Sequence, residues 1–545
     1  MTLTLHRRQL LAAGSFGLAA LSAPGTAQIL SARGFTHNVA SGEPGHYKVM
    51  LWTRYVPAAG DAARLRWEVS RTADFARVAV SGEVTAEAEH DWCVKPVAEG
   101  LDPGTWYHYR FLDGRGGVSP VGRTRTLPNS KSGPTTRFTL GIFSCANLPF
   151  GWFNAYAHAA ARDDIDLMVH LGDYLYEYQR GRYPSADAAM PGRIIEPAGE
   201  AVALADYRLR HACYRADPDL QRLHQLFPMV MMWDDHETAN DAWAGGAENH
   251  GPGEGDWNVR KRAAMRAYRE WLPVSDEAWK SYRIGDLLHL FRPETRLTAR
   301  SRPLDLGAAL AGSRDIGASL TAFRDGPWKD PKRTMLGSEQ EAWLGEGLRR
   351  SVRDGVRWQV LAQQVLMGSI LSSPRIAQWV GADASEMVRQ RSAIGLAAAR
   401  AGLPFNLDMW DGYPAARERL LRSALDADAN LVVLSGDSHN AWGFDLDLGG
   451  APAGVEFAGH SVTSPGYEAY LPRVAPKDLA GAVVAANRPL KWADTHRRGY
   501  LTLELTPDRA TGEWLFLDTV RQRSTRIATR HHMSVAHGAR VLASS

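Results

Sequence analysis

Four short polar motifs each follow an apolar run typical of a buried β-strand. The runs span 138–143, 166–170, 228–233 and 431–434, and the motifs that follow are Ser144-Cys145-Ala146-Asn147, Gly172-Asp173-Tyr174-Leu175-Tyr176-Glu177, Asp234-Asp235-His236-Glu237 with Asn240-Asp241, and Gly436-Asp437-Ser438-His439-Asn440. Ligands of open α/β sheets bind beyond the carboxyl ends of the strands. We therefore expect these four ends to lie in one sheet and to converge on one site.

The side chains of these motifs predict a site for multivalent cations. Asp173, Asp235 and Asp437 would be ionised, Cys145 can add a thiolate, and the motifs contain no Lys or Arg to offset them. Anions gathered at the ends of buried strands lose hydration and repel one another, so either their pKa values rise or cations bind. Carboxylate oxygens suit Ca²⁺ or Mn²⁺, whereas a set with thiolate, phenolate and imidazole suits trivalent iron. The mixture indicates two kinds of metal.

Each motif alone also has a purely structural interpretation. Gly172-Asp173 is a common turn, Cys145 and Tyr176 are typical core residues, and His439 could serve only as a hydrogen-bonding group. Trp233-Asp234-Asp235-His236-Glu237 makes poor core and is unusual for a loop. The four motifs together, each at the end of a strand, favour the metal site.

In combination, the motifs resemble those of the PhoD-like alkaline phosphatases, within the wider calcineurin-like and purple acid phosphatase metallophosphoesterases. The resemblance extends to the N-terminal region through 38–44 and 51–54. It implies an α/β fold, a four-layer metallophosphoesterase core of two packed sheets flanked by helices, preceded by a small all-β sandwich domain. It also implies that the cofactors are Fe³⁺ and Ca²⁺ and that the substrate is a phosphate ester.

The resemblance implies a role for each matching residue. Cys145 would be the thiolate ligand of iron and Tyr176 its phenolate ligand, with Asp173 bridging the metals. Asp437 and His439 would be the ligands from the last motif, with His439 on iron. The remaining matches are Asp235, where many relatives have a metal-binding Asn, and His236, which would face the substrate.

Three features depart from the family pattern or stay open. The strand expected over 358–364 has no His where many relatives have a metal ligand, which favours a hard, oxygen-loving second ion. Glu294 stands where the family suggests Asp. Asp234, Asn240 and Asp241 could be direct ligands or could support the ligands.

These expectations lead to a mechanism and to two alternatives. An oxygen species held between the metals would attack phosphorus, and His236 would stabilise the developing charge or protonate the leaving group. A phosphodiesterase or phospholipase on the same scaffold is the first alternative, because the loops around a site set its specificity. The second is a non-catalytic exported binding protein with a degenerate core.

The elements around the motifs divide the chain in two. Residues 34–128 contain short strands rich in aromatic and β-branched residues, which predict an immunoglobulin- or fibronectin-like sandwich. After a Pro/Ser/Gly linker at 128–134, strand and helix patterns alternate through the catalytic domain, 135–530. Residues 183–199 and 301–320 read as irregular.

The N-terminus is typical of an export signal. Arg7 and Arg8 precede a short apolar stretch and the small residues 25–27, which predicts a twin-arginine-type signal peptide over 1–27, recognised by the twin-arginine export machinery. We expect a periplasmic or secreted protein with no stable membrane span in the mature chain. The net charge of +3 is too small to indicate a nucleic-acid partner. The three cysteines, an odd and sparse count, argue against a disulfide framework but leave one Cys93–Cys213 bridge open.

Overall fold

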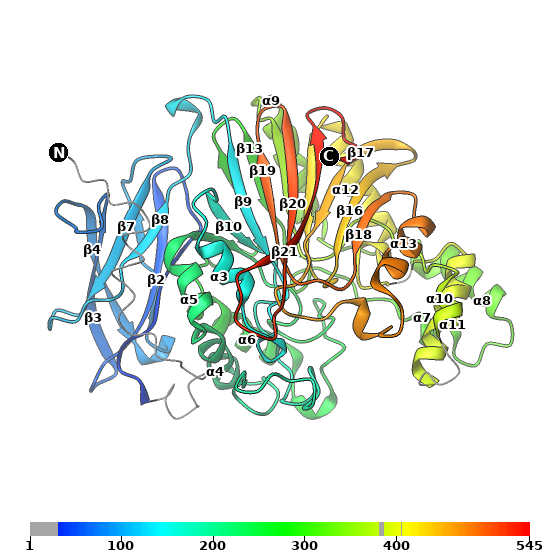
Figure 1. The fold of residues 1–545 in the computed structure, drawn as a ribbon, viewed down its shortest axis with the longest axis horizontal. Coiled ribbons are helices and arrows are strands. Elements are labelled where there is room, and N and C mark those ends of the chain that lie inside the picture. Colours follow the sequence, from blue (N-terminus) through cyan, green and yellow to red (C-terminus); the bar gives the residue numbers. More distant parts are fainter. Residues whose placement is uncertain (1–30, 381–385, 405, 545) are drawn as a thin grey trace.

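The computed structural model describes residues 31–380, 386–404 and 406–544, whose arrangement is shown in Figure 1. The predicted signal peptide, 1–27, lies outside the described residues. The described chain begins in a β sandwich, continues through two large sheets with helices, and ends in strands of the first large sheet.

The N-terminal region forms the predicted sandwich, drawn in blue in Figure 1. One sheet has the order β4-β3-β7-β8 and faces strands β1, β2, β5 and β6. Leu65, Val69 and Tyr109 from the first sheet pack against Val39 and Leu51 from the second. The strands are β1 (Gly34–Gly42), β2 (Lys48–Val56), β3 (Ala62–Ser70), β4 (Val78–Glu87), β5 (Cys93–Val94), β6 (Val97–Glu99), β7 (Trp106–Leu112) and β8 (Gly122–Arg125).

The sandwich is joined to the catalytic region by backbone pairing. Strand β1 runs parallel to β11 (Pro228–Met231), with Ser41 opposite Pro228 and Gly42 opposite Met229. One sheet of the sandwich therefore continues into the first large sheet. The sequence pattern did not predict this pairing, and the domain limits 34–128 and 135–530 stay a prediction.

Two large sheets form the centre of the molecule. In the first, the strand order is β22-β21-β20-β19-β9-β10-β11-β1-β2-β5, and in the second it is β12-β13-β14-β15-β17-β16-β18. The first sheet contains β9 (Phe138–Phe143), β10 (Leu167–His170), β19 (Gly499–Leu505), β20 (Arg509–Leu517), β21 (Ile527–Ala536) and β22 (Ala543–Ser544). The second contains β12 (Lys280–Ile284), β13 (Leu288–Arg292), β14 (Trp358–Ala362), β15 (Leu431–Ser435), β16 (Ala441–Leu448), β17 (Ala451–Ala458) and β18 (Leu490–Asp494).

The two sheets pack face to face and each carries helices on its outer face. Val169 of β10 and Val432 of β15 belong to the apolar cluster between the sheets. The first sheet is covered by α3 (Asn154–Ala160), α4 (Leu204–Arg215), α5 (Pro218–Leu226) and α6 (Trp257–Trp271), and the second by α9 (Ser338–Arg353), α12 (Pro414–Asp426) and α13 (Pro476–Ala486). The predicted four-layer core is confirmed.

Strand β10 shows why these strands read as continuous apolar runs. Leu167 and Val169 point to the core between the sheets, whereas Met168 points to the core beneath the helices. Side chains alternate along a strand, so a strand buried on both faces has no polar face to show.

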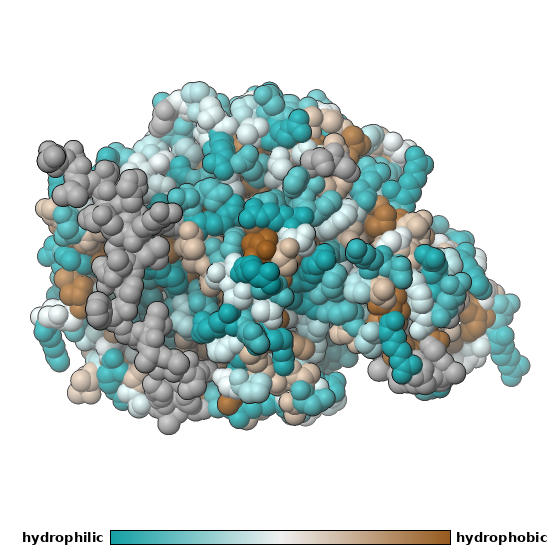
Figure 2. Space-filling view, in the orientation of Figure 1, coloured by the Kyte–Doolittle hydropathy of each residue, from teal (hydrophilic) through white to brown (hydrophobic). Residues whose placement is uncertain are grey.

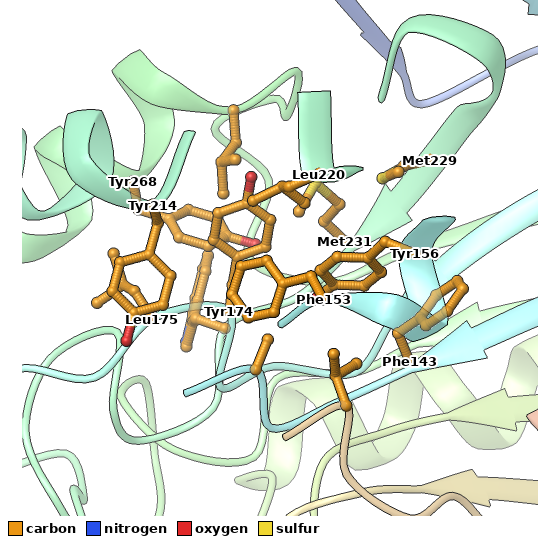
Figure 3. Close-up of a cluster of buried hydrophobic side chains, with 14 of the residues drawn as sticks. Phe143, Phe153, Tyr156, Tyr174, Leu175, Tyr214, Leu220, Met229, Met231 and Tyr268 are labelled. Atoms are coloured by element: carbon orange, nitrogen blue, oxygen red, sulfur yellow. The ribbon is translucent and has the colours of Figure 1, made fainter. Parts of the chain in front are cut away.

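An aromatic cluster lies between the first sheet and its helices. Figure 3 shows the rings of Phe153, Tyr174 and Tyr214 gathered there, beside Phe143 and Tyr156. Tyr174 is completely buried in this cluster and directly follows Asp173. The packing therefore holds the loop on which the candidate metal residues lie.

One expectation from the sequence is wrong, and one open question is settled. Residues 301–320, predicted as irregular, contain α7 (Leu306–Leu310) and the start of α8 (Ile316–Phe323), which lie near α10 (Ile376–Trp379) and α11 (Glu386–Arg400). Asp305 and Asp315 cap the N-termini of α7 and α8 by accepting hydrogen bonds from backbone N–H groups. An Asp before a helix is a known start signal, but the Gly, Pro and Ser around both residues favoured an irregular loop. Cys93 and Cys213 are both free and buried, so the bridge that the sequence left open does not form.

The outer surface is mostly hydrophilic, as expected when the apolar side chains lie between the layers. Figure 2 shows a mostly hydrophilic face with small, separate apolar patches. Within the described residues, no helix has both the length and the apolar character needed to cross a bilayer.

The junction between sandwich and catalytic region predicts a sensitive position at Gly42. A methyl group there would lie 2.3 Å from the carbonyl oxygen of Pro273 and 2.9 Å from that of Met229. Overpacking of this kind typically costs about 1–3 kcal/mol, so we expect Gly42→Ala to lower the urea midpoint of unfolding. Gly253→Ala is the matched control, since a methyl group there meets nothing within 4 Å. Equal midpoints for the two variants would contradict the tight junction.

Candidate metal centre

The four polar motifs meet at one place, but they come from two sheets. Strands β9, β10 and β11 are parallel neighbours in the first sheet, so their carboxyl ends lie at one edge. The fourth motif follows β15, which belongs to the second sheet. The expectation of a single sheet is therefore wrong, and the site lies where the ends of two packed sheets come together.

Two glycines allow the loops to approach this closely. A side chain on Gly172 would lie 2.4 Å from Cβ of Asp234, and one on Gly436 would lie 2.6 Å from Cβ of Ser144. The second contact joins the two sheets. Glycine is thus required before Asp173 and Asp437 by space, because no other residue lets the backbones come so near.

The loops hold four of the candidate residues in a strained conformation. Cys145, Asp173, Asp437 and His439 all have positive φ angles, between 53° and 61°. Non-glycine residues rarely adopt this region, and such strain concentrates at functional sites. The backbone turns sharply at each strand end.

The candidate ligands form three overlapping groups. One ligand atom from each of Cys145, Asp173 and His439 lies within 4.8 Å of the others, and the same holds for Asp173, Asp235 and His236, and for Asp234, Asp235 and Asp437. Asp173 and Asp235 each belong to two groups, so the three groups are continuous.

Tyr176 joins the group that contains the thiol. Its hydroxyl donates a 2.9 Å hydrogen bond to Oδ2 of Asp173 and lies 3.2 Å from Nε2 of His439. Nδ1 of His439 donates to the carbonyl oxygen of Pro465 at 2.9 Å, which turns Nε2 toward the group. Burial lowers the pKa of His439 to about 4, so the imidazole is neutral, as a metal ligand must be.

Two oxygens of the buried acids lack hydrogen-bond partners. Oδ1 of Asp173 and Oδ2 of Asp234 are buried and accept no hydrogen bond from the described residues. Burial raises the pKa values of Asp173 and Asp234 well above the usual range and that of Asp437 to about 8. Burial and the neighbouring Asp173 also raise the pKa of the Cys145 thiol. Multivalent cations would reverse all of these costs, so the donor set fits metal ions.

Arg296 is a component of the site that the sequence did not predict. Its guanidinium is completely buried, and it donates to Oδ1 of Asp234 at 2.5 Å and to Oδ1 of Asp437 at 3.0 Å. Nη1 donates to Asp408 at 2.6 Å. The four motifs themselves contain no Lys or Arg, as the sequence shows. In the folded protein, however, Arg296 from another loop offsets part of their negative charge, which corrects the sequence-based expectation. Burial opposes ionisation of Asp235, whereas His236 and Arg296 lower its pKa below the usual value.

The residues left open by the sequence now have definite places. Asp234 lies in the acidic group and binds Arg296. The backbone N–H of Asp241 donates to Oδ2 of Asp235 at 2.6 Å, so Asp241 supports that side chain. Asn240 donates its backbone N–H to Glu177 and its side chain to Glu248, and belongs to none of the three groups.

Two departures from the family pattern have structural explanations. Glu294 accepts hydrogen bonds from the backbone N–H groups of Arg296, Leu297 and Thr298, and thereby holds the loop that presents Arg296. Gln364, after the strand without a His, bonds to Thr295 and to the carbonyl oxygen of Trp233. Both side chains stabilise the loops around the site.

Access to the site is from the side of the last motif. The side chains of Asp437 and His439 are 18% and 16% exposed, whereas those of Asp173 and Asp235 are 2% and 3% exposed. A ligand would therefore reach the group past Asp437 and His439.

Comparison with known proteins identifies the family. The family model of the PhoD-like phosphatases matches residues 140–514. The model of the N-terminal domain of these phosphatases matches residues 20–128. Alkaline phosphatase D of Bacillus subtilis (strain 168) is 31% identical over 511 residues, which cover 91% of this chain and 80% of that protein.

Solved structures agree with the sequence comparison. The solved structure of PhoD superposes with a TM-score of 0.76 at 28% identity, covering 94% of this chain and 92% of the other. Purple acid phosphatase PPD1 from yellow lupin (Lupinus luteus) shares the fold, with a TM-score of 0.50 at 11% identity over 92% of this chain and 74% of the other. This chain belongs to the PhoD-like phosphatase family and is a phosphoric ester hydrolase.

Proposed function

We propose that this protein is an exported, metal-dependent phosphoesterase that hydrolyses phosphate monoesters, diesters or both. The single observation that carries the metal dependence is the continuity of the three groups, which share the buried carboxylates of Asp173 and Asp235. Residues 7–27 support export by the twin-arginine route to the periplasm or beyond.

Six residues would hold the metals. Fe³⁺ suits the side with Cys145, Tyr176 and His439, because it combines thiolate, phenolate and imidazole. Ca²⁺ suits the side with Asp235 and Asp437, which offers only carboxylate oxygens. Asp173 belongs to groups on both sides, which supports a bridging role.

The chain's own residues would then act on the ester. When bound, such cations neutralise the phosphate and lower the pKa of a bound water. His236 lies beside Asp173 and Asp235, with one ring nitrogen within 4.8 Å of a carboxylate oxygen of each. From there it would protonate the oxygen of the leaving alcohol as the P–O bond breaks. The buried ring of Tyr176, whose centroid lies 4.2 Å from that of His236, would keep bulk water from the imidazole.

Elemental analysis combined with activity tests the proposal directly. We expect the purified protein to contain iron and calcium, to show a phenolate-to-iron absorption band, and to lose hydrolysis of nitrophenyl phosphate after chelation. Bis-nitrophenyl phosphate and a phosphatidyl lipid, assayed beside it, separate monoesterase, diesterase and phospholipase activity.

Asp173→Asn is the variant that ties this result to the site. Loss of a carboxylate shared between the groups should empty both metal positions, whereas Asp164→Asn, whose carboxylate pairs with Arg162 outside the site, should keep them filled. Full metal occupancy in Asp173→Asn would refute the assignment.

His236→Ala tests the proposed proton donor. Loss of a general acid typically slows turnover by about 10²–10⁴-fold, so we expect a fall in kcat of that size on an ester with a poor leaving group, with metal content unchanged. Nitrophenyl phosphate needs less protonation and should be affected less. Near-normal turnover of a poor leaving group by His236→Ala would exclude this role.

Metal removal should also change how stability depends on pH. In the metal-free fold, the pKa of Asp437 is about 8, and those of Asp173 and Asp234 are raised well above the usual range. In the unfolded chain, the pKa of an aspartate carboxyl is about 4, so these groups are protonated only below about pH 4. Between about pH 4 and 8 the folded state therefore holds more protons, and the free energy of unfolding falls as pH rises.

The measurement is urea unfolding of chelated and metal-loaded protein at pH 6 and pH 8. We expect the metal-free protein to lose stability between these values and the loaded protein to lose less, since cations replace the protons. The same pH slope in both forms would count against metal binding by these carboxylates.

A further inference from the structure

A cavity of about 430 Å³ lies where the edge of the second large sheet approaches the first, and its lining includes none of the residues of the three metal-ligand groups. Its walls come from α13 and β18 on one side and from β20 and β21 on the other. We propose that this cavity is a second ligand site, which binds a small anion with a planar aromatic ring, of the class of a nucleoside monophosphate. The inference goes beyond the proposed function, because the site is separate from the metal centre.

The sheet topology explains why a cavity opens here. Strand β18 is the last strand of the second sheet and pairs with β16, so within the described residues its outer side has no neighbouring strand. Helix α13 packs beside β18 (Figure 1) and forms one wall, while the end of β20 and the start of β21 form the other. The two sheets are therefore separated by a recess on this side of the molecule.

Aromatic rings form one surface of the cavity. The rings of Trp492 from β18 and His531 from β21 are stacked, with centroids 3.9 Å apart and an angle of 12° between their planes. Trp514 is completely buried and supports Trp492, with 4.8 Å between the ring centroids. The two stacked rings are half-buried and line the cavity, so a planar ring of a ligand can extend the stack.

Positive charge surrounds the aromatic surface. Among the described residues that line the cavity, four cationic side chains face one carboxylate, and these residues are Lys477, Lys491, Arg497, Arg530 and the acidic Asp494. The carboxylate already has a partner: its Oδ2 accepts a hydrogen bond from Nη1 of Arg497 at 2.8 Å, and its Oδ1 accepts from the backbone N–H of Arg497 at 3.0 Å. The lining therefore carries an excess of positive charge, which favours an anion.

Lys477 is the cation best placed to meet a ligand. It lies in the first turn of α13, is exposed, and pairs with no carboxylate among the residues that the structure describes. Lys491 binds Asp445 at 3.0 Å and Arg530 binds Glu513 at 3.1 Å, but neither acid belongs to the lining. Exposed ion pairs of this kind are weak, so both cations can turn toward a bound anion.

These features together indicate the class of ligand. The volume falls within the range of about 300–1,000 Å³ that is typical of small-molecule pockets. Stacking on an aromatic side chain raises the affinity for a base by roughly tenfold, and lysine and arginine bind phosphate through charge-assisted hydrogen bonds. A phosphate alone would leave the aromatic stack unused, and a neutral ring would leave the cations without a partner.

Isothermal titration calorimetry of the metal-loaded protein with the phosphonate analogue of adenosine monophosphate tests the site. In this analogue a P–C bond replaces the ester P–O bond, so the protein cannot hydrolyse it. We expect adenosine, which lacks the charge, and methylphosphonate, which lacks the ring, to bind the cavity about tenfold more weakly or worse. Because a phosphonate can also reach the metal centre, variants of the lining identify the binding that belongs to the cavity.

Lys477→Glu reverses the charge of the unpaired cation. An acidic residue is favourable in the first turn of a helix, so the variant should fold. We expect the affinity of the cavity for the analogue to fall about tenfold, because the reversed charge repels the phosphonate. Lys131→Glu is the matched control, since it makes the same change at an exposed lysine outside the lining and should bind like the wild type. Both variants should hydrolyse nitrophenyl phosphate at the wild-type rate.

Trp492→Leu removes a ring from the stack and should also weaken binding about tenfold. Trp492→Phe keeps an aromatic surface and should retain most of the affinity. The urea midpoint of each variant is measured alongside, because Trp492 also packs against Trp514. If Trp492→Leu does not fold, the comparison of the analogue with methylphosphonate tests the aromatic contribution in the wild type.

The outcomes separate this site from the metal centre. Unchanged affinity in Lys477→Glu and Trp492→Leu would show that the analogue binds at the metal centre only, and would overturn the proposal. An equal loss in Lys131→Glu, or equal affinity of the cavity for methylphosphonate and the analogue, would overturn it as well. Failure of the wild-type protein to hydrolyse nitrophenyl phosphate would contradict the proposed function and leave binding in the cavity unaffected.

Discussion

The cost of burying negative charge governs this structure. Asp173, Asp234, Asp235 and Asp437 lie at strand ends that are otherwise apolar, and ionised carboxylates in such a place repel one another and lose hydration. Arg296 offsets part of this charge permanently, through Asp234 and Asp437. Asp173 receives no such partner, and one of its oxygens accepts nothing from the described residues. The charge that one arginine leaves uncompensated is the charge that the proposed cations would offset.

Holding that charge in place requires a rigid support. The positive φ angles of Cys145, Asp173, Asp437 and His439 are unfavourable by themselves and persist because the strands and cores behind them leave no alternative. Gly172 and Gly436 let loops from different strands touch, and Tyr174 anchors the Asp173 loop in the aromatic cluster. The four-layer core and the strained loops are therefore parts of one arrangement, in which packing energy maintains a geometry that the loops alone would not adopt.

The sequence predicts those parts of the site that are local. Each motif directly follows a strand that is buried on both faces, so an apolar run followed by polar residues marks it without any knowledge of the fold. The role of Arg296 is not local: it meets Asp437, 141 residues later, and no spacing rule connects the two. The pairing of β1 with β11 involves two residue pairs between distant segments, and it too leaves no periodic pattern. The short helices of 301–320 were missed for a different reason, because glycine and proline around their Asp caps outweigh the helical signal.

The site is chemically asymmetric, and the asymmetry follows from which loops supply each side. The side with Cys145, Tyr176 and His439 contains donors that must lose a proton or stay neutral to bind a metal, and burial raises the pKa values of the thiol and the phenol. A metal bound there would have to displace the protons of the thiol and the phenol. The side with Asp235 and Asp437 contacts Arg296, whose charge does not depend on pH, so its geometry is partly set before any cation arrives. A cation on the carboxylate side would instead enter a frame already held by the Arg296 guanidinium. Asp173 belongs to a group on each side, so a change at its carboxylate would affect both proposed metal positions.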